Sequence, residues 1–337
     1  WSGDHERTKN YLFSPVSRVR SLPAGYRARL LTASLTTYWY GQESAQPAFR
    51  VPCKNRDQTS TNLRHFEQLG LLFVQFNPVR KEMLSEDNSI YTETFAAPMY
   101  ECDANLRWKP SAFLQHMTSA ANQHIDLIGE GYQALLDQGL VWVLSRMKFQ
   151  FLRFPRVEEQ ITIRTWPKTI QQKLFFIRDY EILSASGELL TAATSAWLMM
   201  NMQTRRLVPP SALKLNLPQN LIRHALDEPL EKLTPPADGE ERLRLRAGYS
   251  AIDVVGHVNN ARYIEWVCDA FPIDWHLSHQ LAALQINYDR EVHPEDEVIV
   301  KVASQDDQPG VFALAGQNLT QNTETFTAAV SWKDNPA

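Results

Sequence analysis

Asp253-Val-Val-Gly-His257 is the most informative stretch of this 337-residue sequence, because a similar stretch, Asp103-Ala-Asn-Leu-Arg107, occurs 150 residues earlier. A helix candidate follows each stretch. Apolar residues recur at helical spacing from Phe113 to Leu127 in the first copy and from Ala261 to Phe271 in the second. Pro110 stands in the expected first turn of the first helix, a favoured position for proline. The recurrence predicts one structural unit that the chain contains twice.

Strand candidates follow each helix candidate. Apolar and polar residues alternate there, which is typical of strands with one buried face. The clearest segments are 141–149 and 160–166 in the first copy, and 284–288 and 297–302 in the second. One amphipathic helix per copy is available to cover the apolar face of each sheet. We therefore predict an α+β fold of two tandem hotdog domains, each an antiparallel sheet wrapped around a long central helix.

The domain limits follow from the same pattern. We expect the first domain to span residues 83–208 and the second to span residues 243–337. Residues 209–242 are rich in proline and charge, which is typical of a linker. Residues 1–82 show neither a helical nor a strand period, so we expect an extension outside the core fold. An additional domain with weak sequence signals is the alternative.

Composition and charge narrow the function classes. The net charge of −4 gives no overall attraction to nucleic acid or to an anionic membrane. Cys53, Cys102 and Cys268 form no CxxC pair, and the nine histidines show no HxxxH or HExxH spacing, so we expect neither a metal nor a cofactor. No apolar run is long enough to span a bilayer, and the start of the chain lacks the order of a signal peptide. We expect a cytoplasmic protein without nucleic-acid or membrane partners.

The second copy carries residues suited to acyl chemistry directly before its helix. Gly256 permits a tight turn, and His257 can exchange a proton near neutral pH. Asn259 and Asn260 can cap the helix start, where backbone N–H groups and the helix dipole favour the oxyanion formed when water attacks a thioester. Arg107 replaces the histidine in the first copy, which predicts one working site. The alternative is that His257 only fixes a turn.

These motifs resemble those of the plant and bacterial acyl-acyl carrier protein (acyl-ACP) thioesterases. That family carries the signature Asp-x-Asn-x-His-Val-Asn-Asn-x-x-Tyr, which Asp253–Tyr263 matches except at one position. The segments Leu140–Met147, Ala196–Asn201 and Thr204–Leu207 also resemble the first domain of the family. The resemblance covers about Tyr91 to Trp332. It implies hydrolysis of fatty acyl-ACP to free fatty acid, within fatty acid biosynthesis.

The resemblance also assigns catalytic residues. The family's Tyr-x-Arg-Glu-Cys-like segment reads Tyr288–Val292 here, which implies that Glu291 is the catalytic carboxylate, acting with His257 and Asp253. Val292 replaces the cysteine, so the resemblance favours an activated water over a covalent route. Val255 replaces the catalytic asparagine of the signature, and loss of one oxyanion-type donor typically costs about 10²–10³ in rate.

Substrate and carrier sites are expected on the same basis. The family places the acyl pocket in the first domain, where Met117, Trp142 and Met147 are candidates, although plain core packing is the alternative for each. The carrier protein is acidic, so we expect it to dock on basic residues. Arg205 and Arg206 are the first candidates, followed by Lys214 and Arg262. We also allow for a homodimer.

Two other functions stay open at this stage. One is a different enzyme on the same fold, such as an acyl-CoA thioesterase or a hydratase. The other is a non-catalytic acyl-ACP-binding protein, for which Val255 is the best support.

Overall fold

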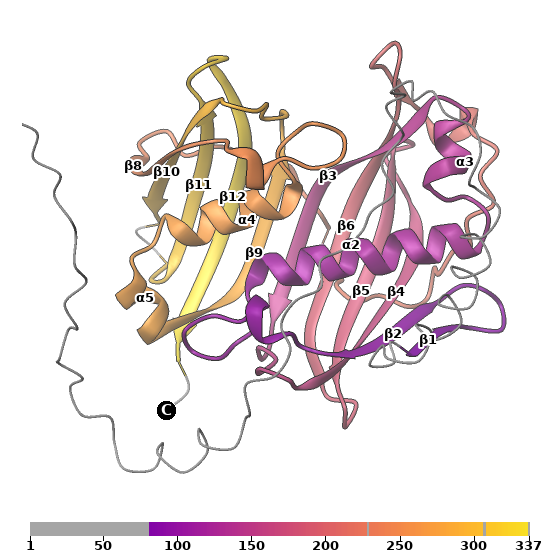
Figure 1. Ribbon diagram of the computed structural model, residues 1–337, viewed down its shortest axis with the longest axis horizontal. Helices are drawn as coiled ribbons and strands as arrows, with labels where there is room; N and C mark the ends of the chain where they lie inside the picture. Colours follow the sequence, from indigo (N-terminus) through magenta and orange to yellow (C-terminus); the bar gives the residue numbers. More distant parts are fainter. Residues whose placement is uncertain (1–80, 228, 306–307, 336–337) are drawn as a thin grey trace, which may run out of the picture. The chain divides into compact units, whose positions relative to one another are not determined.

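The computed structural model describes residues 81–335, except residues 228, 306 and 307 (Figure 1). The extension expected over residues 1–82 therefore lies outside the described residues, apart from its last two. Those two, Lys81 and Glu82, belong to a short strand that pairs with the next one.

The described part contains two series of elements in a similar order: a strand, a short 3-10 helix, two α-helices and then four strands. The first series comprises β1 (Lys81–Leu84), β2 (Tyr91–Ala96), η1 (Met99–Glu101), α2 (Pro110–Leu127), α3 (Tyr132–Leu136), β3 (Leu140–Phe151), β4 (Gln160–Gln171), β5 (Phe175–Ser184), β6 (Leu189–Asn201), β7 (Leu207–Val208) and η2 (Pro210–Ala212). The second comprises β8 (Glu240–Arg246), η3 (Tyr249–Ala251), α4 (Asn260–Asp269), α5 (Ile273–Ser278), β9 (His279–Tyr288), β10 (Glu297–Ser304), β11 (Val311–Asn318) and β12 (Thr323–Asp334). Since β8 begins at Glu240, three residues expected in the linker belong to a strand.

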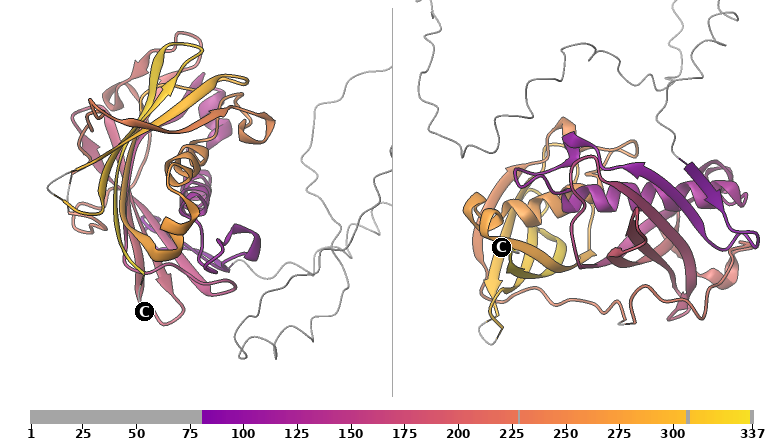
Figure 2. Two further views of the ribbon diagram at one scale, coloured as in Figure 1. Left: turned by 90° about the vertical axis from the view of Figure 1, so that its left-hand side faces the viewer. Right: turned by 90° about the horizontal axis from the view of Figure 1, so that it is seen from below.

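All the strands join one antiparallel sheet, in the order β1-β2-β4-β5-β6-β3-β9-β12-β11-β10-β8, with β7 paired to β6. The two series meet where β3 pairs with β9, from Arg146 opposite Asn287 to Gln150 opposite Ala283. The α2 and α4 helices contact each other and lie on the same concave side of the sheet (Figures 1 and 2). The predicted fold class, two hotdog units in one chain, is confirmed.

One hydrophobic cluster runs between the helices and the sheet in both units. The apolar stripe of α2 explains this packing, because Phe113 and Met117 are fully buried. Leu127, the last residue of the expected stripe, is instead exposed at the end of the helix. In the second unit Ile264 and Val267 of α4 are equally buried. None of the helices in the described part of the chain combines the length and hydrophobicity needed to cross a membrane.

The segment between β7 and β8 packs on the first unit. Leu213, Leu215 and Leu217 contact the apolar cluster around Phe176 and Met199. Further along, the Leu230 carbonyl accepts a hydrogen bond from Arg146 Nη1 at 2.6 Å. This connection is therefore bound to the sheet for much of its length.

Candidate active site

The loop before α4 is shaped by Asp253. Its Oδ1 accepts hydrogen bonds from Val255 N at 3.0 Å and from His257 N at 3.4 Å. Its backbone N–H donates to the His257 carbonyl at 2.9 Å, which closes the turn. Gly256 has φ +86°, a conformation that glycine adopts without strain. Asp253 thus acts through the backbone and fixes where His257 emerges.

The two asparagines define the start of α4. Asn259 is the N-cap, and its Oδ1 accepts from Ala261 N at 3.0 Å. Asn260 is the first helical residue, and its carbonyl accepts from Tyr288 Oη at 3.1 Å. The Asn259 side chain is therefore used to cap the helix, which leaves the helix start itself as the feature that can stabilise an anion.

The segment after β9 carries Glu291 on a backbone held from both sides. Arg290 N donates to the Thr325 carbonyl at 3.1 Å, and Val292 N donates to Tyr263 Oη at 3.1 Å. Burial raises the pKa of Tyr263 well above its ordinary value, so the phenol stays protonated. Val258 N donates to the Val292 carbonyl at 2.9 Å, which ties this segment to the loop before α4.

These two segments bring His257 and Glu291 together. His257 Nε2 lies 3.4 Å from Glu291 Oε2, and both side chains are partly exposed. This distance is longer than a good hydrogen bond, yet both groups can contact one water molecule.

The side chains of Arg205 and His293 also contact the His257–Glu291 pair, and neither was assigned to catalysis from the sequence. Arg205 Nη2 donates to Glu291 Oε2 at 2.6 Å, although we had expected Arg205 to dock the carrier. The His293 ring lies edge-to-face against the His257 ring, with centroids 5.0 Å apart. His293 follows Glu291 by two residues, and this proximity was the one signal that could have identified it.

His257, Glu291 and His293 also form a set that could hold a divalent cation, since one ligand atom from each lies within 4.8 Å of the others. No fixed spacing in the sequence predicts this set, because only the fold brings its three members together. Arg205 already places a positive charge against the Glu291 carboxylate. A metal at this position would have to compete with the guanidinium.

Cys268 does not belong to this group. It lies on α4, and burial raises the pKa of its thiol far above the ordinary value. A thiol that stays protonated is a poor nucleophile.

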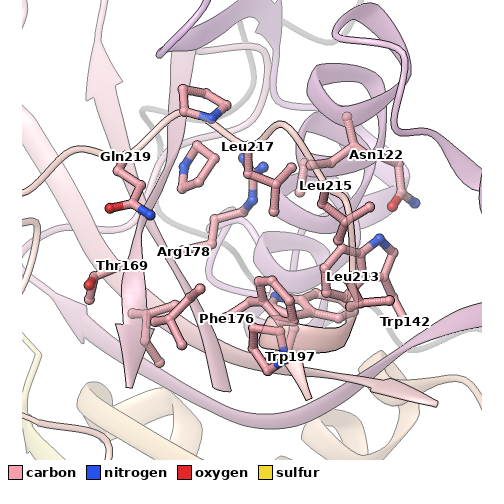
Figure 3. Close-up of a pocket in the computed structure, with 17 residues that line it drawn as sticks. Asn122, Trp142, Thr169, Phe176, Arg178, Trp197, Leu213, Leu215, Leu217 and Gln219 are labelled. Atoms are coloured by element: carbon pink, nitrogen blue, oxygen red, sulfur yellow. The ribbon is translucent and has the colours of Figure 1, made fainter. Parts of the chain in front are cut away.

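A cavity of about 800 Å³, counted with its open mouth, lies in the first unit (Figure 3). Figure 3 shows Trp142, Phe176 and Trp197 beside Leu213 and Leu215. The cavity is lined by Ala121, Asn122, Ile125, Trp142, Pro167, Thr169, Ile170, Phe176, Ile177, Arg178, Trp197, Pro210, Leu213, Leu215, Leu217, Pro218 and Gln219.

Only one of the three expected acyl-pocket residues lines this cavity. Trp142 lines the cavity, whereas Met117 and Met147 do not and are fully buried in the hydrophobic cluster. Arg178 is the one charged lining residue. It donates to His124 Nδ1 and to Thr165 Oγ1, both at 3.1 Å, and burial lowers its pKa to about 10.

The four basic candidates for carrier docking differ in whether an acidic side chain of the protein already pairs with them. Arg262 donates to Glu265 at 2.6 Å, and Arg205 is engaged by Glu291. Arg206 and Lys214 form no ion pair with any other residue that the structure describes.

Comparisons with known proteins agree with both halves of the molecule. Residues 88–211 match the family model "Acyl-ACP thioesterase N-terminal domain", and residues 235–334 match the model of the C-terminal domain. A palmitoyl-acyl carrier protein thioesterase of Gossypium hirsutum is 31% identical over 219 residues, which are 61% of this chain and 53% of that protein. Oleoyl-acyl carrier protein thioesterase 2 of Arabidopsis thaliana is 28% identical over 70% of this chain and 68% of its own length. The chain thus spans about half the length of the Gossypium relative.

Solved structures show the same architecture. An acyl-ACP thioesterase from Bacteroides thetaiotaomicron superimposes with a TM-score of 0.62 and 25% identity, covering 74% of this chain and 100% of that one. A 12:0-ACP thioesterase from Umbellularia californica gives a TM-score of 0.61 at 22% identity over 73% of this chain and 98% of its own.

Proposed function

Because the chain belongs to the acyl-ACP thioesterase family, we propose that it hydrolyses fatty acyl-ACP with a water molecule that His257 and Glu291 activate. The observation that carries this proposal is the 3.4 Å approach of His257 Nε2 to Glu291 Oε2, in a unit whose helix start can stabilise an oxyanion. The released fatty acid would enter lipid metabolism.

In the proposed reaction each group has one task. Glu291 and His257 hold a water, and Glu291 takes its proton as the water oxygen attacks the thioester carbonyl carbon. The first turn of α4, capped by Asn259, stabilises the negative charge on the carbonyl oxygen. The C–S bond then breaks, the carrier thiolate leaves and takes up the proton, and a free fatty acid remains. Asp253 acts only by holding the loop.

The cavity of the first unit is the proposed acyl site. Its lining is mainly apolar, with Trp142 among the rings, and its size falls within the range of about 300–1,000 Å³ that is usual for ligand pockets. Arg206 and Lys214 are the proposed contacts for the acidic carrier, which would make kcat/KM fall with salt for acyl-ACP but not for a small thioester. From the sequence we further propose a cytoplasmic location, whereas the plant relatives are named as chloroplastic proteins.

The test compares Glu291→Gln with Glu295→Gln, an exposed carboxylate four residues further along the same loop. We expect the first change to lower thiol release from acyl-ACP by about 10²–10⁴-fold, the usual contribution of general-base catalysis, and the second to leave it unchanged. His257→Ala should match the first variant. Near-normal turnover in both site variants would refute the assignment.

The same assay separates the alternatives. Faster hydrolysis of acyl-CoA than of the matched acyl-ACP would favour a coenzyme A thioesterase. Tight acyl-ACP binding by the unmodified protein without thiol release would favour a binding protein.

A further inference from the structure

We propose that Arg205, from the first hotdog unit, is a positioning residue for the catalytic carboxylate Glu291 in the second unit. This inference rests on the proposed function. It makes the active site a joint product of both units and gives Arg205 a different task from carrier docking.

The contact itself is specific to one oxygen. Arg205 Nη2 donates to Glu291 Oε2 at 2.6 Å, and the same oxygen is the one that lies 3.4 Å from His257 Nε2. None of the hydrogen bonds between described residues uses Oε1 of Glu291. A guanidinium fixed on one oxygen orients the planar carboxylate, and the other oxygen is then directed outward to accept from a water.

Hydrogen bonds within the turn that carries Arg205 fix the backbone from which its side chain extends. Asn201 Oδ1 accepts from Gln203 N at 3.2 Å, from Thr204 N at 2.9 Å and from Thr204 Oγ1 at 3.0 Å. Arg205 N donates to the Asn201 carbonyl at 2.8 Å, and Arg205 has φ +53°, in the left-handed region that few side chains other than glycine adopt. This turn joins β6 to β7, so the first unit sets the origin of the guanidinium.

The backbone on the other side is equally constrained. Hydrogen bonds at Arg290 and Val292 fix the main chain on both sides of Glu291. Only the side-chain torsions of Glu291 remain to be set, and Arg205 is the residue that sets them. A displacement of about 1 Å in a catalytic group can cost about 10²-fold in rate.

Stability and docking explain this pair less well. The Arg205 and Glu291 side chains are 60% and 34% exposed, and an ion pair at such a surface adds little to stability because water screens it. A guanidinium already engaged by a carboxylate is also less available to an acidic carrier than the neighbouring Arg206. The pair therefore has its clearest use in orienting the base.

The experiment uses Arg205→Gln and Arg205→Lys in the full chain. Steady-state kinetics are measured with acyl-ACP and with an acyl-N-acetylcysteamine thioester, which has no carrier to dock. We expect Arg205→Gln to lower kcat about 10- to 100-fold on both substrates with little change in KM, and Arg205→Lys to recover part of the loss.

Arg244→Gln is the matched control. Arg244 contacts Glu297 at 2.6 Å and Glu241 at 2.9 Å, and its side chain is 50% exposed. Arg244→Gln therefore removes surface ion pairs of the second unit that are about as exposed as the Arg205–Glu291 pair. Its kcat should equal that of the unmodified protein. Circular dichroism and urea unfolding check that each variant is folded.

The outcomes are distinguishable. A loss confined to KM for acyl-ACP would show that Arg205 docks the carrier, and a rise in kcat would show that the pair restrains the base; either result overturns the inference. In the double variant with Glu291→Gln, we expect no further loss beyond that of Glu291→Gln alone, because the two residues act as one unit. If Glu291→Gln were inactive while Arg205→Gln kept full kcat, only this inference would fail. If Glu291→Gln were fully active, the proposed function itself would fail.

Discussion

Val255→Asn is predicted to accelerate hydrolysis. Val255 occupies the place of the signature's asparagine in the loop between Asp253 and His257, and the residue is 48% exposed. One oxyanion-type donor is worth about 10²–10³ in a water-excluded site. Because this position is half exposed, solvent weakens the gain, and we expect kcat to rise about tenfold, equivalent to about 1.4 kcal/mol of barrier. The hydrogen bond from Val255 N–H to Asp253 Oδ1 involves the backbone of Val255, so the substitution retains it and the loop should keep its shape.

The assay is thiol release from acyl-ACP under saturating substrate. Val254→Asn is the control, since Val254 is adjacent and 98% exposed, and the same amide there should change nothing. Stability should change by no more than about 0.5 kcal/mol in either variant, as for most surface substitutions. Equal acceleration by both variants, or none by Val255→Asn, would contradict the reasoning.

Three further predictions concern the loop, the interior and the metal set. Gly256→Ala should lower the free energy of unfolding by about 1–2 kcal/mol, because φ at this position is +86°, a conformation that strains alanine. An added Cβ meets open space, so steric clash adds nothing to this loss. Urea titration measures the change, and an unchanged free energy would argue against backbone strain. Burial, with the nearby Arg178 cation, lowers the pKa of His124 to about 4 from 6.5. As pH falls, His124 therefore takes up its proton in the unfolded chain first, and the free energy of unfolding should fall by up to about 3 kcal/mol between pH 6.5 and pH 4. His124→Gln should flatten this pH dependence in urea titrations. An unchanged pH dependence would show that His124 is not its cause. Because Arg205 supplies the positive charge beside Glu291, dialysis against EDTA should leave kcat unaltered, whereas a loss restored by zinc would point to a resident metal.

Local patterns predicted much of the fold. The helix expected with Pro110 in its first turn and apolar spacing from Phe113 to Leu127 coincides with α2, because proline, apolar spacing and the glycines beyond the helix all act within a few residues. The second helix ends at Asp269, two residues before the expected end at Phe271. The joining of β3 to β9 was not predicted, since the pairing of strands from different units depends on edges that no local period describes.

The sequence likewise predicted some residues of the candidate site and missed others. His257 and Glu291 could be named because each lies in a motif, and the structure places them side by side. Arg205 reaches Glu291 from 86 residues away in the chain, so only the fold reveals that contact. Met117 and Trp142 looked alike in sequence, because an apolar residue facing a cavity and one facing the core give the same period.

Because β3 pairs with β9 from Arg146 to Gln150, the two hotdog units share one hydrogen-bonded sheet, and we expect them to unfold together. Each unit, produced alone, would expose an unpaired strand edge, at β3 or at β9, and such an edge favours self-association. Heating the whole protein should therefore melt both units in a single calorimetric peak.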